Sequence, residues 1–150
     1  MTLSPTILIP VAIVFTVGVG FAIQAPLNAS LGKQIGSGVA AAAISFGVGF
    51  AALLLLTLAF GDGGAFGRAA DVPAFYWAGG LLGAAVVWAM LWAVPTIGIL
   101  TAMAALLFGQ LGAALVLDAL GAFGAPVTPI TWQRVAALGL VAGGLVLSRL

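Results

Sequence analysis

Histidine, cysteine and glutamate are absent from this 150-residue chain, and charged side chains of any kind are scarce. Without histidine and cysteine, the chain lacks the side chains that bind most zinc, haem and iron–sulfur centres, and it cannot form a disulfide. Without glutamate, paired carboxylates for acid–base catalysis would have to come from three well-separated aspartates, Asp62, Asp71 and Asp118. We therefore expect no enzyme activity, no metal site and no cofactor.

Charged residues make up 5% of the chain, whereas a soluble domain has about a quarter. Hydrophobic residues make up 64%, and the mean hydropathy is +1.34, so the chain cannot cover itself with water-compatible side chains. The four cations are too scattered to form the basic face that nucleic acid requires; they are Lys33, Arg68, Arg134 and Arg149. The composition therefore predicts an integral membrane protein, with the lipid bilayer as a partner and no nucleic acid.

Five apolar segments follow one another, each near the roughly 20 residues with which a helix crosses hydrocarbon about 30 Å thick. The expected spans cover residues 5–31, 38–60, 73–94, 97–118 and 129–148 of one transmembrane domain, residues 1–150. Helix-start signals open four of them: Ser4–Pro5, Ser37, Asp71 with Pro73, and Thr128–Pro129. The uncharged run over residues 74–117 would form a helix about 66 Å long, so we expect it to break near Pro95–Thr96.

The last segment has only 13 fully apolar residues, Val135 to Leu147. It reaches spanning length if Arg134 and Arg149 extend to opposite interfaces, with Trp132 in the aromatic belt. With it, the fold class is all-α with five transmembrane helices, and the two termini lie on opposite sides of the membrane.

The basic residues give this five-helix chain no preferred orientation. Arg68 and Arg134 fall on the N-terminal side, and Lys33 and Arg149 on the other, two against two. Excess Lys and Arg on the cytoplasmic side normally fixes orientation. The balance therefore predicts either insertion in both orientations or a partner of fixed orientation, although so few charges also balance by chance. Two opposed copies would each supply half of an inverted-repeat transporter architecture.

Polar residues within a span are costly and often functional. Gln24 and Asn28 lie one helical turn apart with Pro26 between them, and proline frees the carbonyl of residue 22. These groups predict a neutral binding site in a kinked or broken helix. Alternatively, the helix ends here and the residues form an interfacial turn. Ser45, in the second span, either joins a binding site or only bonds its own helix.

Asp118 is the only carboxylate close to a span, and it lies where a helix ends before Gly121. A carboxylate at that end opposes the helix dipole, so we expect either a structural ion pair with Arg134 or a proton-coupling role. Gln110 lies on nearly the same face of that helix as Asp118. Trp88 and Trp92, one turn apart, either wall a cavity or pack against lipid and neighbouring helices.

Small residues also recur one turn apart, as Gly79-x-x-x-Gly83 and Gly139-x-x-x-Gly143. Such pairs let two helices approach closely in a membrane, within one chain or between two.

In combination, several short motifs resemble the YdcZ family of small bacterial inner-membrane proteins in the drug/metabolite transporter superfamily. They are Gln24-x-x-x-Asn28-x-x-Leu31, Ile44-Ser45-Phe46-x-x-Gly49, Gly79-Gly80-x-x-Gly83, Gly109-Gln110-Leu111 and Asp118-x-x-Gly121-x-Phe123-Gly124. The resemblance implies a five-helix unit that works as an antiparallel dual-topology dimer or as a pair of opposed paralogues. Ala119 stands where many relatives have histidine, and the first-helix glutamate of small multidrug exporters is missing.

We therefore predict a multi-pass bacterial inner-membrane transporter that moves a small solute by alternating access between two opposed copies. Gln24, Asn28, Ser45, Trp88 and Gln110 are the expected substrate-binding residues. Asp118 is the expected coupling or gating residue. The alternative is a non-transporting scaffold or accessory subunit, which would have no water-accessible cavity at membrane depth.

Overall fold

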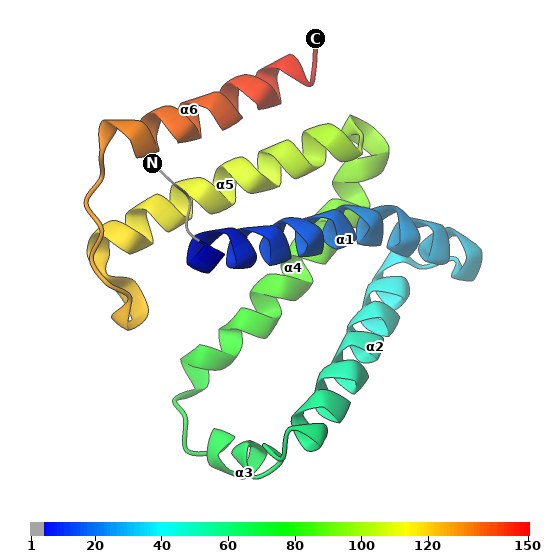
Figure 1. Ribbon diagram of the computed structural model, residues 1–150. Helices are drawn as coiled ribbons and strands as arrows, with labels where there is room; N and C mark the ends of the chain where they lie inside the picture. The colour runs from blue at the N-terminus through cyan, green and yellow to red at the C-terminus, as the bar shows by residue number, and fades with distance from the viewer. Residues whose placement is uncertain (1–4) are drawn as a thin grey trace. The chain divides into compact units, whose positions relative to one another are not determined.

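The computed structural model describes residues 5–150, so the expected cap Ser4 lies outside the described residues. Helices account for most of this part of the chain, and no strand occurs in it (Figure 1). The elements are α1 (Pro5–Ile35), α2 (Gly38–Ala59), α3 (Ala65–Ala69), the 3-10 turn η1 (Ala74–Trp77), α4 (Ala78–Ile97), α5 (Ile99–Leu120), the 3-10 turn η2 (Ala122–Gly124) and α6 (Trp132–Leu147).

Two compact units divide the chain after Trp92. The first contains α1, α2 and α3 with most of α4, and the second contains the end of α4 with α5 and α6. Within the first unit α1 packs on α2, and within the second α5 packs on α6.

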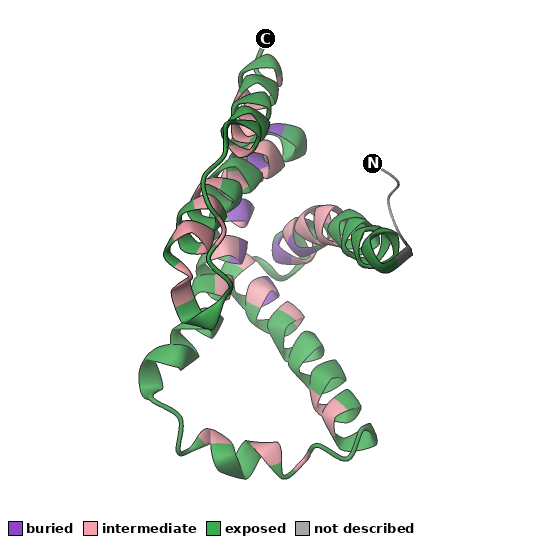
Figure 2. Ribbon diagram, turned by 60° about the vertical axis from the view of Figure 1, so that its left-hand side comes forward, coloured by how far each residue is buried: buried purple, intermediate pink, exposed green. Residues whose placement is uncertain are grey.

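Four helical segments are long and apolar enough to cross a membrane: Thr6–Ile35, Gly38–Ala59, Ala74–Ile97 and Ile99–Leu120. Their large apolar side chains face outwards, and only short stretches are buried (Figure 2). Outward apolar faces suit lipid and not water. The sequence-based prediction of an all-helical membrane protein is confirmed. The α6 helix has 16 residues, about 24 Å in length, so a fifth span stays a prediction.

The α1 helix continues through Pro26 to Ile35. The alternative that the helix ends at Pro26 in an interfacial turn is therefore wrong. Proline has no N–H to donate to the carbonyl four residues earlier. That carbonyl, on Ala22, is left without its helical donor inside a continuous helix.

The break between the third and fourth apolar segments lies at Gly98, two residues beyond the expected Pro95–Thr96. Pro95 is accommodated in the last turn of α4, where it costs one hydrogen bond. Gly98 has φ +80° and ψ 162°, a conformation open essentially only to glycine. The glycine, and not the proline, therefore ends one helix and starts the next.

The α6 helix begins at Trp132, three residues after the expected Thr128–Pro129 start. Thr128 belongs instead to the connection between η2 and α6. The N–H of Thr128 is also used elsewhere, because it donates to the Asp118 carbonyl at 2.9 Å. The expected start at Ser37 is confirmed, since its hydroxyl accepts from the Ala40 N–H at 3.2 Å.

Glycines bring α1 and α2 together at their connection. A Cβ on Gly32 would lie 3.0 Å from the Cα of Gly38, so neither helix could approach as closely with a side chain there. By contrast, Gly79, Gly139 and Gly143 have open space beside them. The two Gly-x-x-x-Gly pairs therefore do not make the close helix contacts within the described chain.

Candidate functional site

Three of the predicted polar residues gather where α1 packs on α2. The Gln24 side-chain Nε2 donates to the Ser45 hydroxyl at 3.4 Å, joining the two helices. Asn28, one turn further along α1, is only 7% exposed. Its carboxamide makes no hydrogen bond with another described residue, but it is not sealed off, since Arg134 Nη1 is the only enclosed side-chain polar atom without a partner in residues 5–150. We call Gln24, Asn28 and Ser45 the α1–α2 polar cluster.

The α1–α2 polar cluster lies well inside a span. Gln24 precedes Lys33 by nine residues, which is about 13 Å of helix. If the Lys33 ammonium reaches the interface, Gln24 lies deep in hydrocarbon about 30 Å thick. The Asn28 carboxamide, which makes no hydrogen bond within the described chain, can donate to and accept from a further group.

Trp88 belongs to the same unit, on α4, but its side chain is 61% exposed. It therefore walls no closed cavity within this chain, and its binding role stays a prediction. Gln110 is exposed on α5, in the second unit. The structure does not establish a contact between either residue and the α1–α2 polar cluster.

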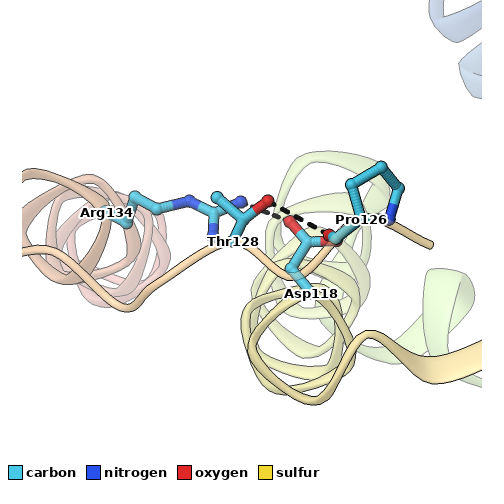
Figure 3. Close-up of polar contacts among 4 residues, drawn as sticks. All are labelled: Asp118, Pro126, Thr128 and Arg134. Atoms are coloured by element: carbon cyan, nitrogen blue, oxygen red, sulfur yellow. Dashed lines mark hydrogen bonds and ion pairs between the residues drawn. The ribbon is translucent and has the colours of Figure 1, made fainter.

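Asp118 and Arg134 form an ion pair between the end of α5 and the first turn of α6 (Figure 3). Gly121, in the left-handed conformation, ends α5 three residues later. The Asp118 carbonyl also accepts from the Thr128 N–H, and the Thr128 hydroxyl donates to the Pro126 carbonyl at 3.4 Å. The structural ion pair that the sequence predicted is confirmed, and a coupling role for Asp118 stays a prediction.

The guanidinium of Arg134 is only partly satisfied by this pair. Nη2 donates to one Asp118 oxygen, but Nη1 is buried with no hydrogen-bond partner among the described residues. Each guanidinium nitrogen at this end carries two N–H donors. The ion pair therefore has an unused donor on Arg134.

Sequence reasoning missed a second polar contact, at the other end of the α5–α6 pair. The buried Thr101 hydroxyl donates to the Ser148 carbonyl at 3.3 Å, and the Ser148 hydroxyl lies 3.1 Å from the Thr101 oxygen. The two helices are therefore antiparallel, with the Asp118–Arg134 and Thr101–Ser148 contacts at opposite ends. The sequence shows a hydroxyl near one end of each apolar segment, but such residues are too common in membrane helices to single out this contact.

Two hollows lie along the seam between α5 and α6. One, of about 170 Å³, is next to Arg134, and the other, of about 470 Å³, is next to Ser148. The first is lined by Leu111, Ala114, Leu115, Arg134, Ala137 and Leu138. Small residues such as Ala114, Ala137 and Gly144 leave this space. Apart from Arg134 and Ser148, the lining is apolar.

No group of three metal-binding side chains occurs in residues 5–150. The donors available here are amides, hydroxyls and one ion pair, which suit reversible binding of a polar solute.

The sequence over residues 9–147 matches the model of a family described as "Putative inner membrane exporter, YdcZ". No curated protein and no solved structure matches the chain significantly.

Proposed function

This chain belongs to the YdcZ family of multi-pass inner-membrane proteins, and on that premise we propose that it is a small secondary transporter of the drug/metabolite type. It moves a small polar solute across the inner membrane by alternating access. The observation that carries this proposal is the α1–α2 polar cluster, in which Asn28 is buried and unpartnered beside the Gln24–Ser45 hydrogen bond.

In this proposal, Asn28 binds the solute directly, because its carboxamide offers both donors and an acceptor. Gln24 and Ser45 orient one another and add a second set of polar atoms. Their bond, at 3.4 Å, is long, so a bound solute can replace it at little cost. The neutral cluster suits a polar or cationic solute more than an anion, because it holds no cation.

Two chains in opposite orientations make up the working unit. Support comes from the two-against-two distribution of Lys and Arg and from Gly139 and Gly143, which have open space beside them for a second chain. Two opposed copies reproduce the inverted repeats of many transporters. Trp88 and Gln110, both exposed in one chain, then complete the solute site from their exposed faces.

The α6 helix is the fifth span of this unit. The Asp118–Arg134 and Thr101–Ser148 contacts are 17 residues apart on α5 and 14 apart on α6, or about 26 Å and 21 Å of helix. Polar contacts separated by nearly the thickness of the hydrocarbon fit a helix pair that crosses it with local thinning.

Asp118 acts as a gate or coupling group. Its side chain is 38% exposed and that of Arg134 is 34% exposed, so water reaches the pair and the two side chains can separate during transport. Breaking the pair removes the side-chain link between the end of α5 and the first turn of α6, which would open this end of the second unit.

Water access to the α1–α2 polar cluster tests the proposal, since a scaffold needs no aqueous cavity at this depth. The chain has no natural cysteine, so a single Ser45→Cys substitution gives an unambiguous thiol of nearly the same size. Ala43→Cys is the matched control, because residues two apart project about 200° apart on a helix. We expect a membrane-impermeant thiol reagent to label Ser45→Cys and not Ala43→Cys in native membranes.

Transport itself is measured by comparing solutes released from cells that express the wild type with those from cells that express Gln24→Ala or Asn28→Ala. Gln34→Ala, an exposed amide on the same helix, is the control. We expect at least one solute whose release falls about tenfold or more in the two cluster variants but not in the control. Equal release by all variants, with Ser45→Cys unlabelled, would favour the scaffold alternative.

A further inference from the structure

The seam between α5 and α6 carries the Asp118–Arg134 ion pair at one end and is mostly apolar along the rest of its length. Arg134, Ala137 and Val141 on α6 recur every three or four residues, and Leu107, Leu111 and Leu115 on α5 recur every four. They therefore lie along one face of each helix. Two separate hollows, of about 170 Å³ and 470 Å³, follow one another along these faces, and the smaller one is next to Arg134. We call this seam with its two hollows the apolar groove.

The ion pair at the end of the groove has one unused group of each sign. One carboxylate oxygen of Asp118, Oδ2, accepts a hydrogen bond from Arg134. Arg134 uses Nη2 there and leaves Nη1 without an acceptor. A rotation about the last side-chain bonds presents Nη1 to the hollow, because Arg134 itself lines it. The pair as a whole is neutral, so it does not attract a ligand of net negative charge.

From this arrangement we infer that the groove binds a zwitterionic phospholipid whose headgroup carries a primary ammonium. The phosphate accepts from Arg134 Nη1, the ammonium donates to the free Oδ1 of Asp118, and an acyl chain lies in the apolar groove. Both charge-assisted bonds are strong, and each charge of the headgroup meets its opposite. A lipid with an anionic headgroup would meet the Asp118 carboxylate without a compensating ammonium.

The site is distinct from the α1–α2 polar cluster and does not depend on the proposed transport activity. Its test is lipid retention by the purified full chain in detergent, measured by native mass spectrometry. The probes are phosphatidylethanolamine, phosphatidylglycerol and phosphatidylcholine with identical acyl chains, supplied in equal amounts. We expect one phosphatidylethanolamine per chain, retained about tenfold over phosphatidylglycerol because one charge-assisted bond is lost with the latter.

Phosphatidylcholine separates charge from hydrogen bonding, because its quaternary ammonium has a positive charge but no N–H. We expect retention between that of the other two lipids. Equal retention of all three would mean an unspecific lipid shell and would overturn the inference. A preference for phosphatidylglycerol would also overturn it, since it would mean that Arg134 binds anions without help from Asp118.

Filling the groove tests the position of the acyl chain. Ala114→Leu places a larger side chain in the hollow, whereas Ala113→Leu adds the same volume on a residue that does not line it. We expect about a tenfold loss of retained phosphatidylethanolamine in the first variant only. Equal retention in the two variants would refute the groove as the site. The wild-type competition between headgroups decides the proposal even if Ala114→Leu does not fold.

Discussion

The connection after α5 makes a sharp prediction about Gly121. Gly121 has φ +60° and ψ 33°, the left-handed conformation that costs an L-residue about 1–2 kcal/mol. A Cβ there would also lie 2.7 Å from Cγ2 of Val127 and 3.2 Å from the Ala125 carbonyl. Overpacking of this kind costs about 1 kcal/mol or more. We therefore expect Gly121→Ala to lower the free energy of unfolding by about 2–3 kcal/mol.

The two contributions can be separated by a second substitution. Val127 is 70% exposed, so Val127→Ala should cost little alone while it removes the closest clash. In the double variant we expect the backbone cost, about 1–2 kcal/mol, to remain together with the contact to the Ala125 carbonyl. Gly109→Ala is the control, since Gly109 lies within the α5 helix with open space beside it, and alanine favours helix there.

Denaturant-induced unfolding of the purified protein in detergent, followed by circular dichroism, measures these differences. The reasoning fails if Gly121→Ala is no less stable than Gly109→Ala, or if Val127→Ala gives no recovery. A functional consequence follows, because the loop after Gly121 includes Thr128, whose N–H donates to the Asp118 carbonyl. Gly121→Ala should therefore also loosen the Asp118–Arg134 pair.

Three further predictions concern other parts of the chain. Thr101→Val should cost about 1 kcal/mol in the same unfolding assay, because it leaves Ser148 without its partner on α5; an unchanged midpoint would contradict this. Pro26→Ala should stabilise α1, because it restores the N–H that bonds the Ala22 carbonyl. The same variant should release less solute if that carbonyl serves transport, and unchanged release would exclude this role. Single cysteines at Leu150, which is 97% exposed, and at Asp71 should each be labelled partly from outside intact cells and fully after lysis; one fully labelled and one fully protected site would mean a fixed orientation.

Contacts between residues far apart in this chain can be predicted from the sequence only where a residue type is rare. The Asp118–Arg134 pair could be predicted because Asp118 is the only aspartate within one of the long apolar segments and few cations are available. The Thr101–Ser148 contact could not, because hydroxyl side chains are common in membrane helices and often bond their own helix. Thr16 and Thr57 do so here, bonding the carbonyls of Ala12 and Leu53.

Helix limits depend on tertiary contacts that local signals do not contain. Pro95 was expected to end a helix, yet it lies in the last turn, and the positive φ of Gly98 ends the helix instead. The start of α6 moves from Thr128 to Trp132 partly because the Thr128 N–H bonds to Asp118, ten residues earlier. Likewise, the Gln24–Ser45 bond depends on the close approach of α1 and α2 that glycine permits near their connection.

Some polar residues of this chain join two helices through hydrogen bonds, whereas Asn28 does not. This difference favours Asn28 as part of the solute site. Asp118 with Arg134, and Thr101 with Ser148, make bonds that hold α5 to α6, so stability accounts for their presence without a bound solute. Asn28 makes no such bond, although the residue is 7% exposed and lies between two apolar helices. A hydrogen bond within the chain therefore does not account for Asn28, whereas an external polar partner would. For that reason Asn28, more than Asp118, is the residue whose substitution should abolish transport while leaving the fold intact.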